Sequence, residues 1–463
     1  MSDTHVDVQL PRIEDFRSDC SPLEIVAAEA QNTRAIATQA YLYAFPAFLH
    51  LRQLTEIIQG RQYSAPAECP LGGWVLMRQL SDPATTTVSP NVDTLYGATY
   101  LLLDRQGPVV LTVPPIPGRY HSVAIMDAFF NNFAIVSPRT FDDKGGAYLL
   151  VPPGWSGTTP AGIRAVFHAP TPSICLVQRI YVRDKSEYAE LHALQDAICL
   201  TPLDRWQQGT GGFPMLDLSE YAIPGLRALR DPLQFFALTN AYLGVNLPPA
   251  EDAGLAALFQ TAGVGPGSQL PSAPAARWAI AQGAADAQAV MNARISAGPF
   301  RRGWRVPDPT SGIAGGLILT RAAVQATQME LFPLVEATYF YAYQDADGQT
   351  LRGDGSYTLT FKAGELPPLH EYGFWSLTMY GENSLLVANE IDRYCIRPDT
   401  TGLTYAADGS LTLRVQRARP QDAPEGNWLP APVGAFNVAL RTYQPQAAII
   451  DGAWFPPAIV RVS

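Results

Sequence analysis

Residues 89–140 read SPNVDTLYGATYLLLDRQGPVVLTVPPIPGRYHSVAIMDAFFNNFAIVSPRT. The Gly and Pro residues that divide this stretch into short apolar runs decide the fold class. Short apolar runs such as 98–104 (ATYLLLD) and 108–114 (PVVLTVP) alternate with Gly and Pro breaks. That spacing is typical of the strands of a β-sandwich or barrel. Similar candidate strands continue to about residue 183, so the stretch predicts a β-rich N-terminal module over residues 61–183.

A long helix is expected before this module, within residues 1–60. Ser21 can cap it, Pro22 suits its first turn, and Glu24 completes a capping box. Apolar residues recur at three-to-four spacing as far as Ile58. Pro46 is expected to kink or break this helix.

The pattern then changes twice more along the chain. Helical periodicity dominates residues 184–332, and strand-like runs return over residues 333–463, where Asp347-Gly348 signals a hairpin turn. The predicted fold is α+β and mainly β. It has two β-sandwich or jelly-roll-like modules joined by a helical insert, with an N-terminal helix.

The two β regions share a weak internal repeat. Each contains a hairpin, an apolar strand, a Pro-Pro pair and then an aromatic strand. In this alignment Tyr120, His121 and Ser122 overlay 374–376 (FWS). A repeat of this length predicts two related modules, although hairpins of unrelated origin can look alike.

Composition excludes several classes of partner. The 463 residues are 47% hydrophobic and 16% charged, with a formal net charge of −10, which disfavours binding to nucleic acid or to anionic lipid. The densest basic run, 300–305 (FRRGWR), is interpreted as a solvated loop. The N-terminus lacks the apolar core of a secretory signal, and no stretch is long enough to span a membrane, so a cytoplasmic protein is expected. The five cysteines are scattered and indicate neither disulfides nor zinc.

Several separate motifs resemble one known family. They are 91–104 (NVDTLYGATYLLLD), 119–134 (RYHSVAIMDAFFNNFA), 373–396 (GFWSLTMYGENSLLVANEIDRYCI) and 436–445 (FNVALRTYQP). Together they resemble proteins that pair an N-terminal domain of unknown function 1254 with a C-terminal domain of unknown function 1214, over roughly residues 30–180 and 330–463. The resemblance implies β-sandwich and jelly-roll modules around a helical region, and no established activity.

Four residues are candidates for acid–base catalysis: Asp93, Tyr96, Arg119 and His121. Asp93 as general base and Tyr96 as hydrogen-bond donor would face a cavity. Alternation along the strand places Arg119, His121 and Asp127 on one face, but His121 and Asp127 lie roughly 20 Å apart, which excludes a direct dyad. His121 can instead be a hydrogen-bonded structural residue.

A second group is predicted to contact a substrate: Asn91, Asp127, Asn132, Trp375, Tyr380 and Arg393. Asn91 and Asp93 equally suit an Asx turn that satisfies main-chain N–H groups at a sheet corner. Trp375 equally suits a hydrophobic core. No phosphate loop, dinucleotide fingerprint, nucleophile elbow or metal-ligand spacing occurs, so no cofactor and no metal are expected.

These residues favour a cofactor-independent enzyme that acts on a small, largely apolar organic molecule by elimination, isomerisation or hydrolysis. The alternatives are a non-catalytic protein that binds a hydrophobic ligand, and a chaperone-like assembly protein, with a homodimer possible. A pocket smaller than about 300 Å³ would favour the assembly role.

Overall fold

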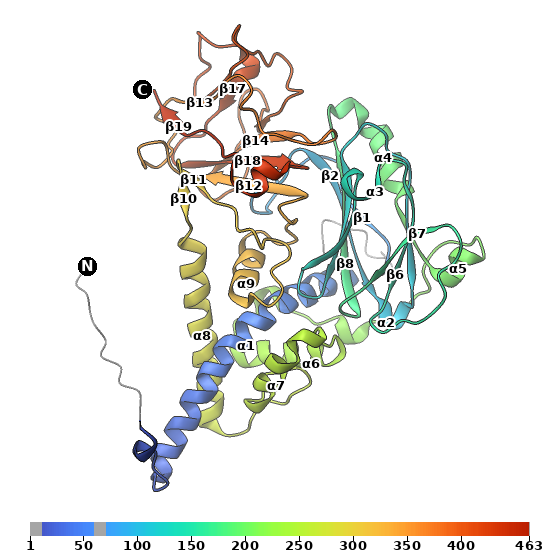
Figure 1. Cartoon of the computed structure of the whole chain (residues 1–463), viewed down its shortest axis with the longest axis vertical. Helices are drawn as coiled ribbons and strands as arrows, with labels where there is room; N and C mark the ends of the chain where they lie inside the picture. The colour runs from blue at the N-terminus through green and yellow to red at the C-terminus, as the bar shows by residue number, and fades with distance from the viewer. Residues whose placement is uncertain (1–11, 60–70, 463) are drawn as a thin grey trace.

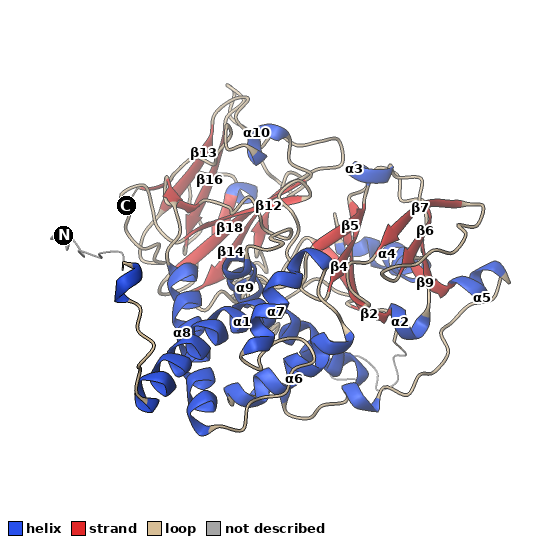
Figure 2. Ribbon diagram, turned by 60° about the horizontal axis from the view of Figure 1, so that its bottom comes forward, coloured by secondary structure: helices blue, strands red, loops and turns tan. Residues whose placement is uncertain are grey.

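A computed structural model describes residues 12–59 and 71–462. Two β-rich modules lie side by side, and a layer of helices runs beneath both of them (Figures 1 and 2). The helices are α1 (Pro22–Ile58), α2 (Leu103–Gln106), α3 (Pro138–Phe141), α4 (Tyr188–Ala197), α5 (Leu203–Gln207), α6 (Pro232–Val245), α7 (Ala253–Thr261), α8 (Pro274–Ser296), α9 (Ile318–Thr327) and α10 (Ala447–Ile450). The α+β class predicted from the sequence is confirmed, with four mostly antiparallel sheets.

The N-terminal module contains two sheets that share one hydrophobic core. Its strands are β1 (Val75–Leu76), β2 (Thr94–Leu102), β3 (Val109–Val113), β4 (His121–Asp127), β5 (Asn132–Val136), β6 (Gly146–Val151), β7 (Ile163–His168), β8 (Ser173–Tyr181) and β9 (Cys199–Pro202). The sheets have the orders β1-β2-β8-β4-β5 and β7-β6-β3-β9. Alternate residues of β2, β4 and β8 fill the space between them, as the period of two requires.

The C-terminal module repeats this plan. Its strands are β10 (Phe300–Arg301), β11 (Trp304–Arg305), β12 (Ala337–Ala342), β13 (Tyr357–Phe361), β14 (Trp375–Gly381), β15 (Cys395–Ile396), β16 (Leu411–Gln416), β17 (Trp428–Pro430), β18 (Phe436–Tyr443) and β19 (Ile459–Arg461). The sheets have the orders β10-β11-β12-β18-β14-β15 and β17-β16-β13-β19, around a second core.

The eight strands from β2 to β9 correspond one to one with those from β12 to β19. Neighbours are the same in both modules, and the pair β6–β7 is parallel in one just as β16–β17 is in the other. Ser122 lies opposite Arg179, and Ser376 lies opposite Arg441. The overlay suggested by the sequence repeat is therefore confirmed in topology and in register.

Helix α1 is continuous through Pro46, so the predicted break is not observed. Ser21 caps α1, and its capping box with Glu24 is present as expected. The second half of α1 is buried against α6, α8 and the outer face of the N-terminal sheet, in the largest hydrophobic cluster of the described chain. Tertiary burial of this kind overrides the helix-breaking tendency of one proline.

Strand pairing extends both modules into the predicted helical insert. β9 pairs with β3, which carries the N-terminal module past residue 183 as far as Pro202. β10 and β11 form a hairpin that pairs with β12. The run 300–305 is thus an edge hairpin of a sheet where a solvated loop was predicted, although residues 300–302 are exposed as expected.

Candidate functional site

The two modules meet through the outer faces of their large sheets, and corresponding residues lie at the junction. Asp93 directly precedes β2, and Glu336 directly precedes β12. The Asp93 main-chain oxygen accepts a hydrogen bond from Val182 at 2.9 Å, and that of Glu336 accepts one from Gln444 at 2.8 Å. Both carboxylates are fully buried.

Asp93 connects the two modules. Its Oδ2 atom accepts hydrogen bonds from Ser376 Oγ at 2.6 Å and from the Tyr443 hydroxyl at 3.3 Å. Asn91 donates to the same Tyr443 hydroxyl at 2.6 Å, and its Oδ1 atom accepts from the Asp93 and Thr94 main-chain N–H groups. The Asx turn expected at this corner is therefore present, and protein atoms surround the Asp93 carboxylate.

Glu336 forms the reciprocal connection. It accepts hydrogen bonds from Tyr120 at 3.2 Å, from Ser137 at 3.1 Å and from Arg139 Nε at 2.8 Å, all of them in the N-terminal module. Burial raises the pKa of Glu336, and the Arg139 charge and these donors oppose that rise. Each module thus supplies a carboxylate that accepts hydrogen bonds from the other module, although the buried Oδ1 atom of Asp93 has no hydrogen-bond partner among the described residues.

Two buried arginines, Arg179 and Arg441, occupy equivalent positions on the central strands β8 and β18. Arg179 donates to the Tyr339 hydroxyl at 3.1 Å, and its guanidinium carbon lies 3.8 Å from the ring centroid of Phe332. Arg441 donates to the Tyr380 hydroxyl at 2.6 Å. Among the described residues neither arginine forms an ion pair, although the Asp93 carboxylate acts electrostatically on Arg441 and the Arg179 charge acts on the buried Glu330.

A cavity of about 220 Å³ lies beside this junction, between α9, the segment 294–311 and the face of β12. Its wall combines apolar side chains such as Val324 and Leu331 with the phenol rings of Tyr339 and Tyr341. Burial raises the pKa of Tyr341 to about 12, against the opposing charge of Arg441. Tyr341 therefore stays protonated at neutral pH and can act as a hydrogen-bond donor.

The charged side chains of the cavity wall are Arg294, Arg305 and Asp308. Arg294 and Asp308 pair with each other at 2.5 Å, and Thr310 also donates to Asp308 at 2.6 Å. Arg305 lies opposite Tyr341 in the sheet. Within the described part of the chain it makes no hydrogen bond or ion pair through its side chain, and it is only partly exposed.

Of the predicted catalytic residues, the structure brings Asp93 and Tyr96 to the junction. Tyr96 lies opposite Arg179, whose guanidinium carbon is 4.7 Å from the ring centroid. Burial raises the pKa of Tyr96, and the Arg179 charge opposes that rise. Neither Asp93 nor Tyr96 lines the cavity.

His121 lies on the opposite face of the same sheet. It pairs with Ile180, which pairs in turn with Leu95, and both of these side chains belong to the core between the two N-terminal sheets. Its Nδ1 atom is 3.1 Å from the Arg119 main-chain oxygen, and burial lowers its pKa. His121 and Asp93 therefore do not converge, because the sheet separates them.

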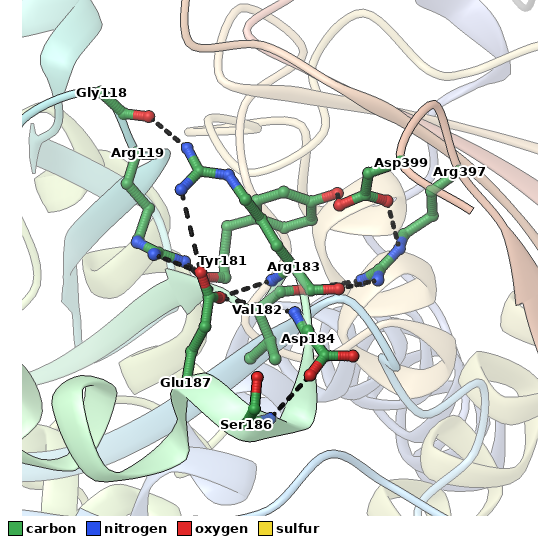
Figure 3. Close-up of polar contacts among 10 residues, drawn as sticks. All are labelled: Gly118, Arg119, Tyr181, Val182, Arg183, Asp184, Ser186, Glu187, Arg397 and Asp399. Atoms are coloured by element: carbon green, nitrogen blue, oxygen red, sulfur yellow. Dashed lines mark hydrogen bonds and ion pairs between the residues drawn. The ribbon is translucent and has the colours of Figure 1, made fainter. Parts of the chain in front are cut away.

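Arg119 belongs to a separate network at the edge of the junction (Figure 3). Its guanidinium makes two hydrogen bonds of 2.9 Å with Glu187 and one of 2.8 Å with the Tyr181 main-chain oxygen. Arg119 lowers the pKa of Glu187 to about 2. In the same view the Tyr181 hydroxyl donates to Asp399 at 2.7 Å, and Arg397 donates to the Val182 main-chain oxygen, so this network also connects the modules.

The residues predicted to contact a substrate are dispersed. Asn91 and Tyr380 lie at the junction, where the Tyr380 hydroxyl donates to the Pro90 main-chain oxygen at 2.6 Å. Trp375 points the other way, into the C-terminal core, and is 3% exposed. Trp375 is therefore a core residue, which was the alternative to substrate contact that the sequence left open.

The remaining three contact other parts of the chain. Asp127 accepts hydrogen bonds within its own turn, from Phe129 and Asn131. Asn132 donates to the main-chain oxygen of Leu331 at 2.9 Å, at the edge of the cavity. Arg393 donates to the main-chain oxygens of Glu425, which precedes β17, and of Trp428, its first residue.

Sequence reasoning missed the residues that line the cavity, Arg305, Tyr339 and Tyr341. The alternation in 338–343 (TYFYAY) places Tyr339 and Tyr341 on one face of the strand, and this pattern can be read from the sequence. The position of Arg305 depends on the pairing of β11 with β12, which no local pattern specifies.

No group of three or more potential ligands that could hold a metal ion occurs among residues 12–59 and 71–462. Over the same residues, no helix combines the length and apolar character needed to cross a membrane.

Comparison with known proteins agrees with this architecture. Two family models, both described as proteins of unknown function, match the chain. DUF1254 matches residues 74–202, and DUF1214 matches residues 336–447. The DUF1254 match ends at the last residue of β9. No curated protein matches the chain.

Two solved structures are similar. The VPA0106 protein of Vibrio parahaemolyticus is 21% identical, with a TM-score of 0.71 over 93% of this chain and 100% of its own. An uncharacterised protein of Burkholderia cenocepacia is 13% identical, with a TM-score of 0.44 over 94% of this chain and 96% of its own. The first likeness concerns the fold alone. With a DUF1254 module followed by a DUF1214 module, the chain belongs to the family of unknown function in which these two modules are paired.

Proposed function

We propose that this protein binds a small, largely apolar organic molecule in the cavity beside Tyr339. The observation that carries the proposal is the composition of the wall, where apolar side chains surround a few converging polar groups. This combination is characteristic of small-molecule sites.

The size of the cavity limits the ligand. At about 220 Å³ it is smaller than sites for drug-sized molecules, which start near 300 Å³. An apolar cavity of about 150 Å³ is enough to hold benzene. A molecule with one ring and a short polar substituent therefore suits the cavity.

A further-reaching form of the proposal is that the protein also converts the bound molecule by acid–base chemistry, through elimination, isomerisation or hydrolysis. Tyr339 supports it, because its hydroxyl accepts the Arg179 hydrogen bond and so retains its own proton for donation. Binding is favoured over turnover, because Asp93 is buried against the other module and Arg119 and His121 lie elsewhere.

The test is ligand-observed NMR with neutral single-ring probes: toluene, phenol, benzamide and 3-phenylpropanamide. Val324→Trp fills the cavity and should abolish binding, whereas Ala326→Trp, at an exposed position of α9 outside the cavity, should not. Equal binding to both variants would place the ligand elsewhere. If turnover occurs, Tyr339→Phe should lower kcat far more than it changes the affinity.

A role in assembly remains the second candidate. The small cavity favours it, and so does the exposed start of α1, where Leu23, Ile25 and Val26 are 83%, 46% and 48% exposed. Light scattering tests it directly. A dimer that dissociates on Leu23→Glu together with Val26→Glu would support assembly through α1, and a monomeric wild-type chain would reject it.

A further inference from the structure

In the part of the chain that the structure describes, no carboxylate lies within ion-pair distance of Arg305, although Arg305 lies in the wall of a mostly apolar cavity. Its neighbour Trp304 points into the C-terminal core, so alternation turns Arg305 to the opposite face of the sheet, beside Tyr341. Gly298 lies next to it, and an added Cβ there would be 3.1 Å from Arg305 Nε. The strand pairing and the close approach of Gly298 thus place Arg305 in the cavity wall.

Among the described residues that line the cavity, Arg305 is the cation without an ion-pair partner. Two arginines and one aspartate line it, and Arg294 already neutralises Asp308. Arg179 and Arg441 lie behind Tyr339 and Tyr341, where the Asp93 and Glu330 carboxylates act on them, so within the described part of the chain the cation that faces the cavity without such a partner is Arg305. A partly desolvated cation is costly unless an anion accompanies it, so this cavity favours a ligand that brings one negative charge.

We infer that the ligand is a small monocarboxylate with an aromatic or branched apolar body, bound through Arg305. The planar guanidinium matches the two oxygens of a carboxylate, and Tyr341 lies opposite Arg305 as an additional donor. The apolar body would lie against Val324 and Leu331. This inference rests on the proposed function, because it names the class of ligand for the same cavity.

Calorimetric titration of the full chain with a matched pair of probes tests it. 3-Phenylpropionate and 3-phenylpropanamide have nearly the same shape but differ in charge. The wild-type chain should bind the acid about tenfold or more tightly than the amide, as expected for hydrogen bonds to a charged group. Arg305→Gln should remove this preference while leaving the affinity for the amide within about twofold, and Arg305→Lys should retain part of it.

Arg302→Gln is the matched control, because Arg302 is an exposed residue of the same hairpin and lies outside the cavity. It should keep the wild-type preference. Equal affinity of wild type for acid and amide, or a preference that survives Arg305→Gln, would overturn the assignment of a carboxylate ligand while leaving the cavity as a binding site. Absence of binding for both the acid and the neutral probes would overturn the proposed function as well.

Discussion

Asp93 and Glu336 occupy the same position in the two modules, and each carboxylate accepts a hydroxyl hydrogen bond from the other module. The donor is Ser376 at 2.6 Å for Asp93 and Tyr120 at 3.2 Å for Glu336. The junction is thus a reciprocal contact between two copies of one strand arrangement, with the candidate cavity at its side.

The Asp93 carboxylate should be important for stability. Asp93→Ala leaves the hydroxyls of Ser376 and Tyr443 without their acceptor, and we expect a loss of about 2–4 kcal/mol in the free energy of unfolding. Asp93→Asn keeps one acceptor oxygen and should cost less. Urea denaturation measures both, with Glu382→Ala at an exposed turn as the control. An unchanged midpoint for Asp93→Ala would refute the connecting role.

Two glycines in helices should respond to alanine with opposite signs. At Gly283 of α8 an added Cβ would lie 2.6 Å from the Arg34 main-chain oxygen of α1, so Gly283→Ala should destabilise by about 1–3 kcal/mol. At Gly254 of α7 nothing lies within 4 Å, so Gly254→Ala should stabilise by about 0.5–1 kcal/mol. Thermal unfolding of both variants checks this, and a stabilising Gly283→Ala would contradict the close packing of α1 on α8.

The Arg119–Glu187 pair should make stability depend on pH in the acid range. Because the folded-state pKa of Glu187 is about 2, below its ordinary 4.5, the pair stabilises the fold above pH 4.5 and loses that effect as pH falls toward 2. Arg119→Gln should cost about 1–3 kcal/mol at pH 7 and progressively less below pH 4.5. Urea denaturation at pH 7, 4.5 and 3 measures the difference. A cost that stays constant over this range would disagree with the ion pair.

His50 should contribute a second pH dependence, at higher pH. It is fully buried beside Tyr242, and burial lowers its pKa to about 3, so the folded state keeps it neutral while the unfolded chain takes up a proton below about pH 6.5. Stability should therefore fall as pH decreases from 6.5 toward 3. His50→Asn should flatten this slope, and His168→Asn, at an exposed position, is the control. Equal slopes in the two variants would count against a neutral buried imidazole.

Strand alternation was predictable from the sequence because it depends only on a local period of two. In β14 this period separates Ser376 and Tyr380, which face the junction, from Trp375, which faces the core, although Trp375 and Tyr380 were predicted together as substrate contacts. The same rule placed Arg119, His121 and Asp127 on one face of their strand, but it could not say which face of the sheet packs against the internal core. That depends on a partner sheet formed elsewhere in the chain.

The candidate site was less predictable because it depends on long-range register. Arg305 meets Tyr341, and Arg179 meets Tyr96, only after strands far apart in sequence have paired. Pro46 illustrates the same limit, since the helix that it should interrupt is stabilised by contacts beyond its own sequence.

The matched order of β2–β9 and β12–β19 has a consequence for shorter chains built on the same plan. A polypeptide with a single unit of this kind would expose the surface that carries its carboxylate, its arginine and its tyrosines. A second, identical molecule related by a twofold axis is the partner best shaped to cover that surface. What is here an intramolecular boundary would then be the subunit interface of a homodimer.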